Sequence, residues 1–222
     1  VVVHVSHNHE EVLSHSLYRS YQGSPLRRLA LYQNHVKIRH LERKLLHRAD
    51  LVTAITDEDR QAYSRISPSR QQFLVLPPGF SGWRSPPREI SNATPKHVVL
   101  IGSFRWIVKT ENLRSVVRIM DPIFHRHGIT LDVVGDVPQN VLDEFRPLAR
   151  ACMFHGFVDD VKPYFQNARI ALVPEVVGGG FKLKMLDYIF SRVPVATIAE
   201  ATQANTSTEP ISSAWSSTRS RT

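Results

Sequence analysis

The sequence of 222 residues contains one cysteine, Cys152, so no disulfide can form within the chain. A single thiol is typical of proteins in a reducing compartment. No apolar run approaches the roughly twenty residues that a helix needs to cross a bilayer. We therefore expect a cytoplasmic protein without a disulfide framework.

Acidic residues are scarce relative to basic ones. The chain has 28 lysines and arginines against 20 aspartates and glutamates, which gives a formal net charge of +8. A positive balance of this size favours an anionic partner. Nucleotide phosphate, lipid headgroups and nucleic acid all fit the balance, and charge does not choose among them.

Short apolar runs alternate with segments of helical spacing along most of the sequence. This alternation predicts an α/β fold in which parallel sheets are covered by helices on both faces. A proline-rich composition marks residues 77–96 as an interdomain linker, so we expect separate domains over residues 1–76 and 97–199. Residues 200–222 are rich in serine and threonine without periodicity, and we expect them to be disordered.

The stretch from Pro174 to Tyr188 indicates an anion site, because three consecutive glycines follow an apolar strand and precede a helix. Glycines let backbone N–H groups approach an anion closely, and a helix start carries partial positive charge. Helical spacing places Gly180, Lys184 and Asp187 on one face, where a cation suits a phosphate and a carboxylate suits a ribose diol. An ordinary glycine-rich connection is the alternative. The predicted nucleotide-binding residues here are Gly178, Gly179, Gly180, Lys182, Lys184 and Asp187.

Polar residues also follow two other predicted strands. His7 follows the strand at residues 1–6, and Gly102 ends the strand that begins at His97. Ligands bind at the carboxyl ends of parallel strands, so we predict that these two residues belong to a site. A histidine-rich loop or a helix start is the alternative at His7.

The sequence predicts no metal site. His4, His7 and His9 alternate along a strand end without a closing set of ligands. The glycine stretch is not a Walker A loop, because Gly-Phe-Lys-Leu-Lys lacks the hydroxyl residue that binds magnesium. Asp159 and Asp160 are expected to cap a helix over residues 161–167.

The run from Pro174 to Val195 resembles the nucleotide-sugar motif of GT-B glycosyltransferases of the retaining group 1 type, in the sub-pattern Gly-Gly-Gly-x-Lys-x-Lys-x-Leu-Glu. Asp187 stands where this pattern ends in glutamate, and Gly179 stands where the commoner form has its first glutamate. The phrases His7-Asn8-His9-Glu10 and Arg48 to Thr56 resemble further elements of the same family.

The resemblance implies two Rossmann-like parallel-sheet domains, of which the N-terminal, acceptor-side one is incomplete. It implies transfer of a sugar, with retention, from a nucleoside diphosphate sugar to a saccharide or lipid-linked acceptor, without a bound cofactor. In that scheme Asp187 binds the ribose and His7 orients the sugar. The leaving diphosphate is stabilised by Arg105, Lys109, Lys184 and the glycine amides. For Arg105 and Lys109 the alternative is a solvated loop.

The resemblance also implies a fragment that lacks both ends. The sequence begins inside a predicted strand, and the family's final helix and strand do not follow Ile198. We therefore expect little transferase activity from this chain by itself. The alternative is a non-catalytic, truncated GT-B module that binds nucleotide weakly or acts through a partner.

Residues 26–48 have the spacing of a long helix, with Leu31, Ile38, Leu41 and Leu45 expected on its inner face. Its many basic residues predict peripheral contact with an anionic membrane. A solvated basic face is the alternative. Nucleic acid is not expected, since the stretch lacks aromatics for base stacking apart from Tyr32. The basic residues are Arg27, Arg28, Lys37, Arg39, Arg43, Lys44 and Arg48.

Overall fold

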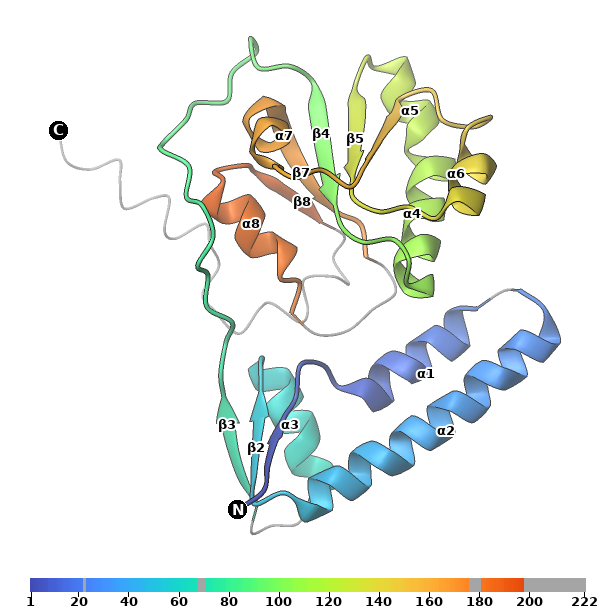
Figure 1. Cartoon of the computed structure of the whole chain (residues 1–222), viewed down its shortest axis with the longest axis vertical. Helices are drawn as coiled ribbons and strands as arrows, with labels where there is room; N and C mark the ends of the chain where they lie inside the picture. The colour runs from blue at the N-terminus through green and yellow to red at the C-terminus, as the bar shows by residue number, and fades with distance from the viewer. Residues whose placement is uncertain (22, 68–70, 176–180, 198–222) are drawn as a thin grey trace, which may run out of the picture. The chain divides into compact units, whose positions relative to one another are not determined.

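The computed structural model describes residues 1–21, 23–67, 71–175 and 181–197. These residues fall into two compact units, the first built mainly from residues 1–79 and the second from residues 80–175 and 182–197 (Figure 1). Both units are α/β with parallel sheets, as the sequence predicts. Gly178 to Gly180 and the expected disordered tail lie outside the described residues.

The first unit has a three-stranded parallel sheet in the order β1-β2-β3. A pair of adjacent helices connects β1 to β2, and one helix connects β2 to β3, as parallel pairing requires. The elements are β1 (Val3–Val5), α1 (Glu10–Ser20), α2 (Pro25–Arg48), β2 (Leu51–Ala54), α3 (Asp57–Ile66) and β3 (Gln72–Val75).

The core of the first unit lies on one face of this sheet. Leu46 at the end of α2 and Tyr63 of α3 are fully buried with Val52 of β2. The side chain of Thr56 accepts a hydrogen bond from the Asp59 N–H at 3.1 Å and so caps the start of α3.

Helix α2 confirms the predicted long helix, but its predicted inner face is wrong in part. Leu41 and Leu45 are 57% and 42% exposed, while the buried residues of the helix are His35, Glu42 and Leu46. The apolar spacing misplaces the face because the polar Glu42 is held inside by hydrogen bonds.

Glu42 replaces a side-chain cap at the start of α1. Its carboxylate accepts the backbone N–H of Glu10 at 2.9 Å and of Glu11 at 2.7 Å. The Tyr63 hydroxyl donates to the same carboxylate at 3.1 Å. One buried acid therefore joins α1, α2 and α3, and satisfies donors that would otherwise be unpaired at a helix start.

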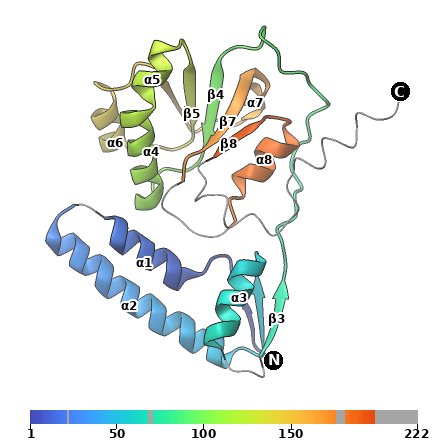
Figure 2. The same cartoon turned by 180° about the vertical axis from the view of Figure 1, so that it is seen from behind.

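The second unit has a five-stranded parallel sheet in the order β6-β5-β4-β7-β8. Helices α4, α5 and α6 lie on one face of the sheet, and α7 and α8 lie on the other (Figures 1 and 2). The elements are β4 (His97–Ile101), α4 (Ile107–Ile119), α5 (Asp121–Arg126), β5 (Thr130–Val134), α6 (Gln139–Phe145), β6 (Cys152–Gly156), α7 (Lys162–Asn167), β7 (Ala168–Val173), α8 (Lys184–Phe190) and β8 (Val195–Thr197).

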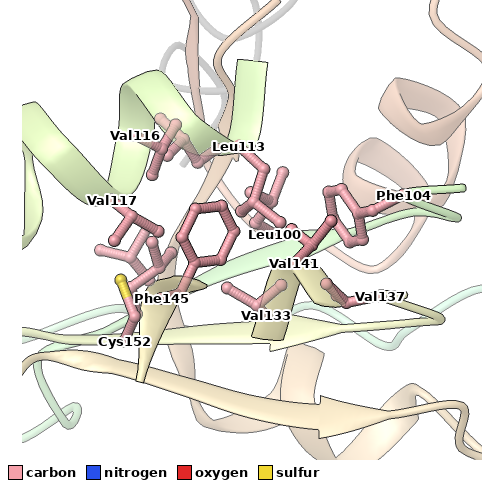
Figure 3. Packing of buried hydrophobic residues seen from close by; sticks show 13 residues of the cluster. Leu100, Phe104, Leu113, Val116, Val117, Val133, Val137, Val141, Phe145 and Cys152 are labelled. Carbon is pink, nitrogen blue, oxygen red and sulfur yellow. The ribbon is translucent and has the colours of Figure 1, made fainter. Parts of the chain in front are cut away.

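Each face of this sheet has its own core, which confirms the predicted double coverage. Figure 3 shows the larger core, where Leu100 and Val133 of the sheet pack with Leu113 of α4 and Phe145 of α6. Cys152 lies at this core, and its burial raises the pKa of the thiol. Among the described helices, none is both long and apolar enough to cross a membrane.

The proline-rich segment expected as a linker lies on the second unit from Phe80 onward. The Phe80 ring stacks on Phe190 of α8 with centroids 4.3 Å apart, and the Ser85 N–H donates to the Phe190 carbonyl at 2.8 Å. Arg88 donates to the carbonyls of Phe165 at 2.6 Å and Gln166 at 2.9 Å. This segment is therefore part of the unit's packing.

The loops after β4 and β5 approach each other at two glycines. Gly135 has φ 128°, and a Cβ placed on it would lie 1.8 Å from the Gly102 carbonyl oxygen. The Gly102 N–H donates to Val134 at 3.0 Å, and the Phe104 N–H donates to Asp136 at 2.8 Å. Gly135 thus fixes the loop that follows β4.

We expect Gly135→Ala to lower the free energy of unfolding by more than about 3 kcal/mol, because the methyl group adds a backbone clash to a strained conformation. Gly128→Ala is the matched control, since its φ is 60° and no atom lies within 4 Å of the added Cβ. Its cost should be about 1–2 kcal/mol. Equal losses in urea unfolding would show that the contact with Gly102 does not constrain the loop.

Candidate functional site

The order of the strands in the second unit reverses between β4 and β7. The chain passes from β4 outward to β5 and β6, then returns to β7 and continues to β8 on the other side. In open parallel sheets, ligands bind outside the carboxyl ends of the strands at such a switch point. Gly102 directly follows β4, and Pro174 and Glu175 directly follow β7.

Tyr188 of α8 lies between these two strands near their carboxyl ends. Its hydroxyl accepts the Ile101 N–H at 2.9 Å and donates to the Leu172 carbonyl at 3.4 Å. The side chain is fully buried, and burial raises the pKa of the phenol. The hydroxyl thus bridges β4 and β7 and anchors α8, which carries Lys184 and Asp187, at the switch point.

Lys184 pairs with Glu175. The ammonium contacts Oε1 of the carboxylate, and the two side chains are only 13% and 9% exposed. Burial lowers the pKa of Lys184, Glu175 partly opposes this effect, and the charge of Lys109 lowers the pKa further. Lys109 therefore lies near enough to Lys184 for their charges to interact.

Lys109 lies in the first turn of α4. Within the described chain, Trp106 at the N-cap makes no side-chain cap bond and the first turn holds no acidic residue. No acidic residue of that turn therefore offsets the partial positive charge of the helix start. Arg105 precedes this turn and is 74% exposed, and its guanidinium pairs with Asp136.

The remaining predicted residues of the second unit lie on the same elements. Gly102 is half-buried after β4, and Lys182 is half-buried before α8. Asp187 is half-buried on α8, and burial raises the pKa of its carboxyl. Of the ten predicted site residues, Gly178, Gly179 and Gly180 lie outside the described residues, so the predicted glycine cradle stays a prediction.

His7 lies in the first unit and is exposed. It borders a hollow of about 280 Å³ between the end of β1 and α2. The exposed side chains of Leu41 and Leu45 line the same hollow together with Asn8. His7 thus belongs to a polar and apolar surface of that unit, and its predicted role toward a sugar stays a prediction.

A possible metal-ligand group in the first unit is formed by His9, Glu11 and Glu42, whose ligand atoms lie within 4.8 Å of one another. Both carboxylates are already engaged. Arg43 donates to the two oxygens of Glu11, each at 2.9 Å, and Glu42 accepts the helix N–H groups. These contacts fit a capping and ion-pair network better than a cation site.

Two residues at the switch point were missed by the sequence analysis as site residues. Glu175 is not among the predicted site residues, although a carboxylate directly after a buried strand is itself a signal. Tyr188 follows Lys184 at helical spacing and carries no sequence mark that separates it from an ordinary core aromatic.

Comparison with known proteins identifies the family. The family model described as "Glycosyl transferases group 1" matches residues 95–208, and the chain belongs to this family. No curated protein sequence matches the chain. The family assignment rests mainly on the second unit, which contains the switch point.

Solved structures show the same fold. WaaG, a glycosyltransferase involved in lipopolysaccharide biosynthesis, is 19% identical with a TM-score of 0.57, over 92% of this chain and 58% of that one. Sucrose-phosphate synthase from Thermosynechococcus elongatus is 19% identical with a TM-score of 0.57, over 90% and 50% of the two chains. Alr3699/HepE from Anabaena, in complex with UDP and glucose, is 17% identical with a TM-score of 0.56, over 75% and 50%. The chain thus resembles GT-B glycosyltransferases and spans about half the length of these three structures.

We expect Tyr188→Phe to lower the unfolding free energy by about 1–3 kcal/mol, because the buried Ile101 N–H loses its acceptor. Tyr164→Phe is a suitable control, since the Tyr164 ring contacts His155 in the same unit. Its cost should be near zero. Chemical unfolding followed by circular dichroism measures both, and equal costs would contradict the bridging role of the Tyr188 hydroxyl.

Proposed function

We propose that the second unit binds a nucleoside diphosphate sugar and belongs to a glycosyltransferase that acts with retention. The observation that carries the proposal is the placement of two cations, Lys109 and Lys184, on the helices that follow β4 and β7 at the switch point of a group 1 family member. The UDP and glucose of the HepE complex support a nucleoside diphosphate and a sugar as ligands.

The chemistry requires stabilisation of the leaving group. The bond between the sugar carbon and the diphosphate oxygen breaks, and a bond from an acceptor oxygen forms on the same face of the sugar. The acceptor proton passes to the departing phosphate oxygen. Lys109 and the start of α4 supply fixed positive charge where negative charge develops, which lowers the barrier without a bound metal.

Three further residues have proposed roles in the reaction. Asp187 accepts hydrogen bonds from the ribose hydroxyls, and Arg105 contacts the diphosphate after exchanging its partner Asp136 for the ligand. His7 orients the transferred sugar. The acceptor is a saccharide or a lipid-linked saccharide.

The second candidate is a non-catalytic module that binds nucleotide weakly. Two observations favour it, because Lys184 is paired with Glu175 and Arg105 is paired with Asp136. Both pairings reduce the charge that a diphosphate would meet. Transfer of radiolabelled sugar to an acceptor separates the candidates, since the module would bind nucleotide without turnover.

Titration calorimetry with the diphosphates of uridine, guanosine and thymidine, and with their hexose conjugates, tests the proposal. At least one nucleotide should bind, and Lys109→Ala should weaken it by roughly 1–3 kcal/mol through loss of a charge-assisted contact. Lys96→Ala is the matched control, because Lys96 is exposed and precedes β4 at the opposite end of the strand. Equal loss of affinity in both variants would show that only the net charge of the protein matters. Absence of nucleotide binding would refute the proposal.

We also propose that α2 brings the first unit to an anionic membrane. Glu42 is buried, and Glu11 pairs with Arg39 and Arg43, so the remaining cations of α2 dominate its surface. Leu26, 81% exposed in the first turn, adds an apolar contact beside Arg27. Cations together with exposed apolar residues are typical of helices at membrane surfaces.

Vesicles that contain phosphatidylglycerol should bind the chain more tightly than neutral vesicles, and salt should weaken the binding. The double variant Arg27→Glu and Lys37→Glu should lose at least about 2 kcal/mol of binding free energy, because each cation near the membrane surface contributes about 1 kcal/mol. The double variant Arg126→Glu and Arg146→Glu, on the second unit, is the control for net charge. Sedimentation with both vesicle types measures the binding, and identical behaviour of the two double variants would contradict a role for α2.

A further inference from the structure

The two carboxylate oxygens of Glu175 lie in different environments. Oε1 contacts the Lys184 ammonium, whereas Oε2 is fully buried and has no hydrogen-bond partner among the described residues. The whole side chain is 9% exposed. Buried carboxylate oxygens are normally paired, so this atom requires an explanation.

The unpaired oxygen has an energetic cost. A buried acceptor without a donor loses its hydration and gains no hydrogen bond in exchange. A hydrogen-bond donor on a bound molecule would satisfy it. A carboxylate accepts hydrogen bonds and donates none, so the complementary group on that molecule is an O–H or N–H and not a phosphate oxygen.

The location of Glu175 identifies the molecule. Glu175 is the second residue after β7, at the switch point where the proposed nucleotide sugar binds. The charge of Lys109 lowers the pKa of Lys184, the partner of Glu175. The contact with Glu175 neutralises Lys184. Of the two neighbouring lysines, Lys109 is therefore the better candidate for the diphosphate, while Lys184 and Glu175 together form a neutral polar pair.

We propose that Glu175 is a specificity-determining residue of the donor site, whose Oε2 accepts a hydrogen bond from a hydroxyl group of the nucleoside diphosphate sugar. Lys184 is the positioning residue that holds the carboxylate through Oε1. This inference rests on the proposed function and changes the role predicted for Lys184, from contact with phosphate to orientation of Glu175. A site built in this way discriminates against analogues in which the hydroxyl is missing, because the buried oxygen then stays unpaired.

Glu175→Ala tests the proposal, with Glu89→Ala as the matched control, because Glu89 is an exposed glutamate of the same unit. The probes are the nucleoside diphosphate that binds the unchanged protein most tightly in the titrations above, and its hexose conjugate. We expect Glu175→Ala to weaken the sugar nucleotide on the order of tenfold, as for a lost hydrogen bond to a charged group. The bare diphosphate should change less than about twofold if the hydroxyl is on the sugar.

A ribose hydroxyl as the donor gives a different pattern. Glu175→Ala would then weaken both probes equally, and the unchanged protein would bind the 2′-deoxy or 3′-deoxy diphosphate as weakly as the variant binds the normal one. Either pattern supports the proposal, and the pair of probes tells the two hydroxyl sources apart.

The opposite outcome would overturn it. If Glu175 is only a counter-ion of Lys184, its removal frees a cation, so Glu175→Ala should bind the bare diphosphate more tightly and the sugar nucleotide no more weakly. Binding of no probe by the unchanged protein would refute the proposed function and this inference together. If the unchanged protein binds the probes and Glu175→Ala weakens neither of them relative to Glu89→Ala, the inference alone is refuted.

Glu175→Ala leaves Lys184 buried without its partner, which can unfold the unit. The double variant Glu175→Leu and Lys184→Met removes both charges and keeps the volume, so it should fold and still show one of the two patterns of weakened binding described above. Thermal unfolding of each variant shows whether it is folded under the titration conditions. Unchanged affinity for both probes in the folded double variant would also overturn the proposal.

Discussion

The arrangement of the candidate site depends on the hydroxyl of Tyr188. Strands β4 and β7 pair in parallel from His97 to Val99 of β4. Nearer the carboxyl ends of the strands, this hydroxyl bridges Ile101 and Leu172. Because a phenol hydroxyl can both accept and donate a hydrogen bond, it satisfies one backbone group on each of the two strands. The Ile101 N–H thus keeps a hydrogen-bond partner at the switch point, and the same contact anchors α8 there.

Buried carboxylates organise both units. Glu42 accepts the first N–H groups of α1, and Asp121 accepts the N–H groups of Arg150, Ala151 and Cys152 at the start of β6. Burial alone would raise the pKa of Asp121, but these hydrogen bonds outweigh burial and hold the pKa below its ordinary value. Glu175 differs from both, because one of its oxygens is unpaired among the described residues.

The sequence predicted the alternation of strands and helices and the double coverage of the second sheet, because these depend on local spacing. The predicted inner face of α2 was wrong at Leu41 and Leu45, because a contact between distant residues keeps Glu42 inside. At the candidate site, spacing placed Lys184 and Asp187 on a helix after the glycines. The pairing of Lys184 with Glu175 depends on tertiary packing, which spacing does not encode.

The segment from Phe80 to Arg88 sets the true beginning of the second unit. It covers the Phe190 ring and supplies donors to carbonyls of α7 and α8, so a protease or a cloning boundary at His97 would expose that ring and leave those carbonyls without their donors. The second unit therefore starts about seventeen residues before its first strand, as expected when connecting chain contributes to a domain's packing. Expression of this unit as a separate polypeptide should begin at Phe80.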